Sequence, residues 1–164
     1  MKKRSINMLI VGLLLLGLFA VVLIVFLEDT HDNFEENIVI SQDGVTEEVL
    51  KFENLRLVPT QKTEYTVNLV CAASGKYHIS LDYAEKTNGG MRDFVKVLIK
   101  YGDNVAYSGG LNDLLLGSVV EFDGELYADD PLPITINYAM PEEVGNEAQG
   151  TFEDFIICLK IEKI

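Results

Sequence analysis

The chain is poor in the residues from which active sites and metal centres are usually built. Its 164 residues include no tryptophan, two cysteines and two histidines, His31 and His78, which lie far apart in the sequence. A zinc site usually needs three or four nitrogen or sulfur ligands. The sequence also lacks a phosphate-binding glycine loop, the His-Glu-x-x-His and Gly-x-Ser-x-Gly motifs and a Cys-x-x-Cys pair. We therefore expect no catalytic residues, no metal ligands and no cofactor, and a protein that is not an enzyme.

Positive charge is also scarce. Lysine and arginine number 13 against 26 aspartates and glutamates, which gives a net charge of −13. Three of the basic residues, Lys2, Lys3 and Arg4, stand near the N-terminus, so residues 28–164 hold all the acids and have a net charge of −16. Such a surface repels nucleic acid and anionic lipid headgroups. We expect no nucleic-acid partner.

One uncharged run organises the rest of the chain. Ile6–Leu27 contains no charged residue. A helix rises about 1.5 Å per residue, so a run of this length spans the ~30 Å hydrocarbon core of a bilayer. The lysines and arginine before the run place the N-terminus in the cytoplasm and everything after Leu27 outside. The sequence thus predicts a basic tail (1–5), a transmembrane anchor (6–27), an acidic linker (28–36) and an extracellular domain (37–164).

A cleaved secretory signal is the alternative interpretation of the same run. Such signals have an apolar stretch of about 7–15 residues and small residues at positions −3 and −1 of the cut. Here the run is longer, and the best internal cut, after Ala20, has Leu18 at −3. We expect an uncleaved anchor and a single-pass protein of the cell membrane, whereas cleavage would release a secreted domain.

Short runs of alternating apolar and polar residues fill the rest of the sequence, separated by turn residues. In Thr63–Ala73, for example, Tyr65, Val67 and Leu69 share one face, which is typical of a half-buried strand. The candidate strands are 37–41, 45–58, 63–73, 77–84, 94–101, 105–107, 119–122, 134–140 and 155–161. Eight or nine short strands with almost no helix predict an all-β fold, an antiparallel β-sandwich or jelly roll.

Local signals add detail to this pattern. Two hairpins are expected, one joining Thr63–Ala73 to Tyr77–Ala84 and the other joining Phe94–Tyr101 to Val105–Tyr107. The alternation breaks at Glu53 and Asn54, which predicts a bulge or a short turn. Residues 111–116 are the one patch that predicts a helical turn.

The two cysteines leave two interpretations open. Cys71 and Cys158 could form a disulfide in an oxidising exterior. The strand phase, however, places Cys158 on the face opposite to Ile157 and Leu159. Two small buried apolar residues without a bond between them are the favoured interpretation.

Acidic and aromatic residues supply the candidate binding sites. Carboxylates at Asp123, Glu125, Asp129 and Asp130, and a second group in residues 29–36, could offer oxygen ligands to Ca²⁺, although solvated turns explain them better. The seven tyrosines could form a carbohydrate platform, although aromatic residues are ordinary strand formers and core packing is favoured. They are Tyr65, Tyr77, Tyr83, Tyr101, Tyr107, Tyr127 and Tyr138.

Three short stretches follow the pattern of a known family. They are Phe26–Thr30 followed by Asn37–Val39, Leu57–Pro59 before the run at Thr63, and Val144–Gly150 before the last run to Ile161. They resemble the camelysin/TasA-like exported bacterial proteins. The resemblance implies a jelly-roll domain exported by Gram-positive bacteria, and the family includes subunits of extracellular matrix fibres and proteins described as metalloproteases.

The chain departs from this family at the processing site. Leu23, Val25 and Glu28 stand where the family has small residues and a serine or threonine, so cleavage does not carry over. The sequence contains no zinc motif, so protease activity does not carry over either. We expect a non-enzymatic surface protein that binds a protein partner or associates with itself. If the protein is a subunit of an extracellular matrix, we expect residues 28–42 to supply a strand to a sheet of a neighbouring molecule. The alternatives are a cell-surface module that binds a glycan or Ca²⁺, and a camelysin-like protease.

Overall fold

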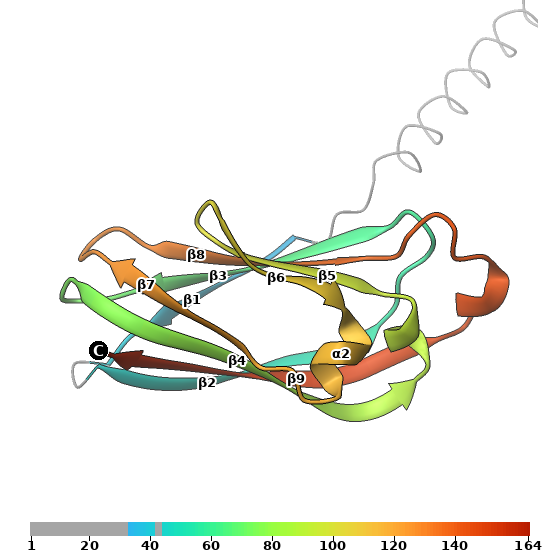
Figure 1. The fold of residues 1–164 in the computed structure, drawn as a ribbon, viewed down its shortest axis with the longest axis horizontal. Helices are drawn as coiled ribbons and strands as arrows, with labels where there is room; N and C mark the ends of the chain where they lie inside the picture. The colour runs from blue at the N-terminus through green and yellow to red at the C-terminus, as the bar shows by residue number, and fades with distance from the viewer. Residues whose placement is uncertain (1–32, 42–43) are drawn as a thin grey trace, which may run out of the picture. The chain divides into compact units, whose positions relative to one another are not determined.

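Nine strands in the described residues, 33–41 and 44–164 of the computed structural model, form two facing sheets (Figure 1). Sheet A has the order β1 (Asn33–Val39), β3 (Lys62–Val70), β8 (Leu132–Ala139), β5 (Lys96–Tyr101) and β6 (Asn104–Gly110). Sheet B has the order β2 (Val45–Leu55), β9 (Phe152–Lys163), β4 (Gly75–Gly89) and β7 (Val120–Leu126). The predicted all-β sandwich is confirmed. The predicted anchor at 6–27 lies outside the described residues.

The alternating pattern of the sequence explains how the two sheets pack. In β9, buried and half-buried residues alternate from Glu153 to Ile161, so one face turns to the core and the other to solvent. Apolar side chains from both sheets meet between the layers, and burying each one stabilises the fold by about 1.5–3 kcal/mol. The residues without exposed surface include Leu69, Ile99, Ile134, Ile136 and Tyr138 from sheet A, and Ile79, Ile157 and Ile161 from sheet B.

The hairpin predicted from Thr63–Ala73 and Tyr77–Ala84 is wrong. The first run forms β3 in sheet A and the second forms β4 in sheet B, so the turn between them crosses from one layer to the other. Alternation fixes which face of a strand is buried, but it does not distinguish a neighbour in the same sheet from a partner across the core. The second predicted hairpin is confirmed, since β5 and β6 pair antiparallel with Tyr101 opposite Asn104.

Strand β1 departs from the predicted antiparallel pattern. It begins at Asn33, inside the predicted linker and before the predicted start at Asn37, and it pairs parallel with β3 from Asn33 and Glu64 to Val39 and Val70. Residues 33–39, part of the segment expected to donate a strand to a neighbour, therefore already pair within their own chain.

Short helical segments lie at one end of the sandwich (Figure 1). The predicted helical turn is confirmed as α2 (Leu111–Leu115), in which Leu111 and Leu114 are completely buried. Two 3-10 turns, η1 (Met91–Asp93) and η2 (Asn146–Ala148), accompany it. In the part of the chain that the structure describes, no helix has the length and apolar character needed to cross a bilayer.

A buried ion pair, which the sequence pattern did not indicate, joins η1 to β9 of sheet B. Glu153 on β9 has no exposed surface, and its Oε1 accepts a hydrogen bond of 2.8 Å from Nη2 of Arg92. The backbone N–H of Arg92 donates to the other oxygen at 3.3 Å, and the guanidinium also contacts Glu85 of β4. Burial lowers the pKa of Arg92, but Glu85 and Glu153 more than offset this and raise the pKa overall.

Candidate functional site

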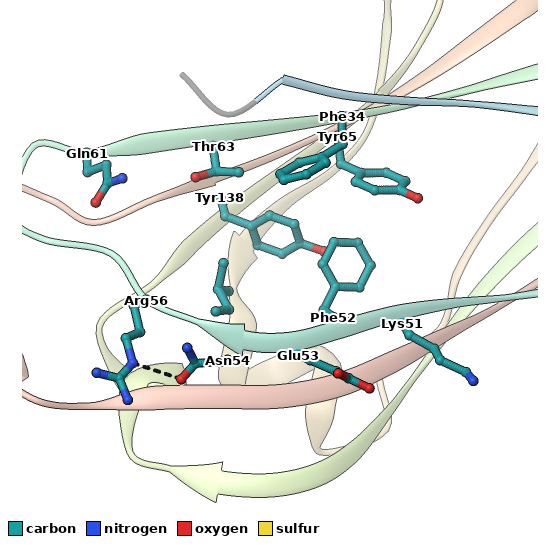
Figure 2. Close-up of a pocket in the computed structure, with 11 residues that line it drawn as sticks. Phe34, Lys51, Phe52, Glu53, Asn54, Arg56, Gln61, Thr63, Tyr65 and Tyr138 are labelled. Carbon is teal, nitrogen blue, oxygen red and sulfur yellow. Dashed lines mark hydrogen bonds between the residues drawn. The ribbon is translucent and has the colours of Figure 1, made fainter. Parts of the chain in front are cut away.

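A hollow opens between the edges of the two sheets. It lies where β1 and β3 of sheet A face β2 of sheet B, and it has a volume of about 640 Å³ (Figure 2). We call it the edge groove. It is lined by Phe34, Lys51, Phe52, Glu53, Asn54, Leu55, Arg56, Gln61, Thr63, Tyr65 and Tyr138.

Aromatic rings from both sheets form the floor of the edge groove. Figure 2 shows Phe34 and Tyr65 close together beneath sheet A, with Phe52 reaching toward them from β2. The rings of Phe34 and Tyr65 lie 6.1 Å apart at an interplanar angle of 28°, and Phe52 lies 5.0 Å from Tyr65. Phe52 also stacks on Phe155 of β9 at 4.8 Å, and Tyr138 lies 5.6 Å from Phe52. Phe34 is 54% exposed, so part of this aromatic surface faces solvent.

A β-bulge in β2 shapes the lower wall. Phe52 pairs with Phe155 and Leu55 pairs with Glu153, so β2 advances three residues while β9 advances two. Asn54 takes the left-handed backbone conformation, with φ of 56°, and its N–H donates to Oδ1 of Asp154 at 2.6 Å. Asparagine tolerates this conformation better than most residues. The bulge predicted at Glu53 and Asn54 is confirmed, and it moves these two residues to the rim of the groove.

Polar side chains surround the aromatic floor. Nε of Arg56 donates to Oδ1 of Asn54 at 2.8 Å, and the guanidinium lies 5.8 Å from the ring of Phe152. Oε1 of Gln61 accepts a hydrogen bond from the N–H of Val58 at 3.0 Å, which leaves its amide NH₂ as a donor. The rim therefore presents guanidinium and amide donors beside an aromatic surface.

The electrostatics of the groove keep its phenols protonated. The hydroxyl of Tyr65 donates to Oε2 of Glu36 at 2.6 Å, and burial, followed by this carboxylate, raises the pKa of Tyr65 to about 12. Burial also raises the pKa of Tyr138 well above its usual value, and its hydroxyl lies 3.3 Å from that of Tyr83. Neither tyrosine is activated as a base, because both pKa values move away from neutral pH.

A second hollow shares one lining residue with the edge groove. It has a volume of about 480 Å³ and lies between residues 56–59 and 144–151. Arg56 borders both hollows. The first hollow is thus bordered by the aromatic floor, and the second by the polar loop that contains η2.

The tyrosines divide between core and surface. Tyr77, Tyr83 and Tyr138 are buried, and Tyr65, Tyr101 and Tyr107 pack against the core. Core packing, the favoured interpretation, thus accounts for six of the seven, while Tyr127 is 54% exposed. Sequence analysis did not predict Phe34 and Phe52 as site residues. The break in alternation beside Phe52 was the one signal that could have indicated them.

The other candidate residues lie apart from the groove. Cys71 is buried and Cys158 is half-buried, and both are unpaired thiols in the structure. Asp123 accepts a hydrogen bond from Nδ1 of His78 at 2.8 Å on the outer face of sheet B. Within residues 33–41 and 44–164, no three histidine, cysteine or acidic side chains are grouped so as to hold a metal ion. Asp29 and Asp32 lie outside the described residues.

Comparisons with known proteins find only distant likeness in structure. No family model and no curated protein matches the chain. The pre-peptidase C-terminal domain of a collagenase from Bacillus anthracis is 12% identical, with 77% of this chain and 95% of that chain covered and a TM-score of 0.37. A mutant of PliG, a periplasmic inhibitor of g-type lysozyme from Escherichia coli, is 8% identical, with 80% and 99% covered and a TM-score of 0.34. A C-terminal CBM6 of LamC, a laminarinase from Zobellia galactanivorans, is 12% identical, with 71% and 100% covered and a TM-score of 0.33.

Proposed function

We propose that this chain is an exported, membrane-anchored surface protein whose β-sandwich acts by binding and not by catalysis. Residues 6–27 anchor it, with residues 1–5 in the cytoplasm and the sandwich outside. The uncharged run and the lysines and arginine that precede it support this topology. The proposal includes a jelly-roll relationship to the camelysin/TasA-like proteins, which the polar stretch Val144–Gly150 before the closing strand supports.

The composition of the edge groove carries the proposal. Its lining includes no histidine, cysteine or serine among the described residues, and Glu53 is its only acid. Hydrolytic sites usually need a nucleophile with an adjacent base or a pair of carboxylates. Aromatic rings beside amide and guanidinium donors instead provide contact area and hydrogen bonds, which is the composition of a binding surface.

The two hollows that share Arg56 favour an extended segment of a partner protein as the occupant. Side chains on one face of an extended chain repeat about every 7 Å, so successive side chains can enter neighbouring hollows. Backbone pairing along β2 is disfavoured, because its exposed edge bears Glu47, Glu48 and Lys51 and its ladder is interrupted by the bulge. The partner is therefore held through its side chains.

A glycan is the second candidate occupant. The near-parallel rings of Phe34 and Tyr65 offer a partly exposed flat surface, and Arg56, Asn54 and Gln61 offer planar polar groups beside it. Sugar rings present C–H bonds to aromatic faces and hydroxyls to such groups. This observation concerns the same groove and predicts the same dependence on Phe34.

A binding experiment with defined probes tests the proposal. The full chain, held in a zwitterionic detergent without a sugar headgroup, is incubated with phage-displayed heptapeptides and with hexasaccharides of glucose and of N-acetylglucosamine. We expect capture of peptides, and about tenfold weaker capture by Phe34→Ala, since one aromatic contact contributes about 0.5–1.5 kcal/mol beyond its buried area. Val39→Ala is the matched control, because Val39 is 69% exposed on the same strand but does not line the groove.

Each outcome decides between the candidates. Capture of hexasaccharides in place of peptides, with the same dependence on Phe34, selects the glycan. Capture that Phe34→Ala leaves unchanged, or no capture of either probe, rejects the edge groove as the binding surface. Recovery of shortened probe, detected by mass spectrometry, rejects binding without catalysis.

A further inference from the structure

Arg56 is an arginine without an acidic partner in an acidic chain. The described part of the chain contains two arginines, and the other one, Arg92, contacts both Glu85 and Glu153. Within that same part, no carboxylate lies within salt-bridge distance of Arg56. Aspartate and glutamate nevertheless outnumber lysine and arginine by 26 to 13. The exposed guanidinium of Arg56 is therefore available to a carboxylate from another molecule.

Two neighbours hold this guanidinium in position. Its Nε donates to Oδ1 of Asn54 at 2.8 Å (Figure 2), and its central carbon lies 5.8 Å from the centroid of the Phe152 ring. Asn54 is itself held, since its N–H donates to Oδ1 of Asp154 at 2.6 Å. These contacts occupy Nε and one face of the guanidinium, so both Nη groups keep their N–H donors, without an acceptor among the described residues. Two Nη groups side by side match the two oxygens of a carboxylate.

The second hollow offers one positive charge and no negative charge. Arg56 is the one charged residue in its described lining, and the amides of Asn146 and Gln149 and the hydroxyl of Thr151 are its other polar side chains. A carboxylate in this hollow therefore meets a cation and neutral groups. Elsewhere residues 28–164 have a net charge of −16 and repel anions. A preference of this protein for an acidic ligand thus requires a local site of this kind.

We infer that the partner segment contains an aspartate or glutamate whose carboxylate binds Arg56 in the second hollow, while an aromatic or large aliphatic side chain of the same segment packs on the aromatic floor of the edge groove. The inference rests on the proposed function and specifies the chemistry of the partner. Charge complementarity selects the acid, because Arg56 is the residue that the two hollows share.

The separation of the two contacts limits the spacing in the partner. Phe52 of the aromatic floor and Arg56 are four positions apart, which corresponds to at most about 14 Å of extended chain. Side chains on one face of an extended partner repeat about every 7 Å. The acidic residue should therefore stand two or four positions from the aromatic or aliphatic residue.

Charge variants of a captured peptide test the inference. Phage-displayed heptapeptides retained by the full chain are sequenced, and the most enriched one is synthesised with an amidated C-terminus, so that any carboxylate belongs to a side chain. Two matched peptides replace its acid by the corresponding amide and by lysine. Fluorescence anisotropy in the same detergent measures the binding of each peptide. We expect the acidic peptide to bind about fivefold more tightly than the amide peptide, the upper range for an ion pair in contact with solvent.

Substitutions of Arg56 locate this preference. Arg56→Gln should bind the acidic and amide peptides equally, and Arg56→Glu should bind the lysine peptide best. Lys51→Gln is the matched control, because it removes one positive charge from β2 and from the lining of the edge groove but leaves Arg56 in place. The fivefold preference should persist in this control.

Every other outcome overturns the inference. Enriched peptides without an acid, a preference for the acid that persists in Arg56→Gln or Arg56→Glu, or a preference that Lys51→Gln also abolishes would each show that Arg56 is not the carboxylate site. In these cases peptide capture still depends on Phe34, so the proposed function stands. Capture of hexasaccharides alone, or no capture that depends on Phe34, overturns the inference together with the peptide as the occupant of the groove.

Discussion

Replacing Arg92 by methionine tests whether losing the arginine of the buried ion pair destabilises the fold more than losing Glu153. Glu153 has no exposed surface, whereas the side chain of Glu85 is 39% exposed. Without Arg92, the charge of Glu153 loses its only salt-bridge partner among the described residues. Without Glu153, the guanidinium keeps Glu85 as a partner. Arg92→Met should therefore be much more destabilising than Glu153→Gln.

The magnitudes follow from the cost of burying charge. Removing one member of a buried pair costs about 3–5 kcal/mol when the other is left uncompensated. A hydrogen-bonding replacement of Glu153 by glutamine, with Arg92 still paired to Glu85, should cost about 1–2 kcal/mol. A domain of this size is stable by about 5–15 kcal/mol, so Arg92→Met lowers the melting temperature by roughly 10–15 °C. The double variant Arg92→Met/Glu153→Met removes both charges and should recover most of the loss.

Near-ultraviolet circular dichroism of tyrosine is the suitable assay. The chain has no tryptophan, and all seven tyrosines lie between Tyr65 and Tyr138, so the signal reports the sandwich and not the N-terminal region. The native chain and the three variants are unfolded by urea in the same detergent. Equal losses of unfolding free energy in Arg92→Met and Glu153→Gln would refute the idea that the uncompensated charge of Glu153 causes the destabilisation. A double variant that is less stable than Arg92→Met would refute it too.

Three further outcomes follow from other contacts. The phenol of Tyr65 should titrate near pH 12 by ultraviolet absorbance, and Glu36→Gln should bring it closer to 10. The hydrogen bond that Nδ1 of His78 donates to Asp123 is the largest cause that raises the pKa of His78. This pair therefore stabilises the fold fully below the unfolded value of about 6.5 and is lost as the pH rises through the folded pKa. A proton NMR titration should show the pKa of His78 falling in Asp123→Asn. Phe155→Ala should cost about 3–5 kcal/mol by urea unfolding, since the ring is 1% exposed and packed among three others.

Features that depend on local periodicity were predictable from the sequence. The alternation in 63–70 and 155–161 identified β3, β9 and their buried faces, and the interruption at Glu53 and Asn54 identified the bulge. The turn at Gly102–Asn104 identified the β5–β6 hairpin. In each case the relevant interaction lies within a few residues, and the residue type alone constrains the backbone.

Features that depend on long-range contacts were not predictable in the same way. The turn at 71–74 between β3 and β4 has the composition of a hairpin turn, but the chain uses it to change sheets. Arg92 and Glu153 are 61 positions apart, and nothing near either residue marks it as buried. The aromatic floor combines Phe34 and Tyr65 from sheet A with Phe52 from sheet B. Its existence depends on which strands lie at the edges, which a single sequence does not specify.

The edge groove and the protection of the sheet edge have the same structural origin. An exposed strand edge invites pairing with another chain unless charges or a bulge interrupt it. The bulge at Asn54 interrupts the edge of β2, and because it adds one residue, it keeps both Phe52 and Leu55 in the lining of the groove. The hydrogen bond from Asn54 to Asp154 holds this geometry in place. The bulge that disfavours strand addition at β2 thus also shapes the hollow, so the aromatic floor stays open while the backbone edge of β2 is interrupted.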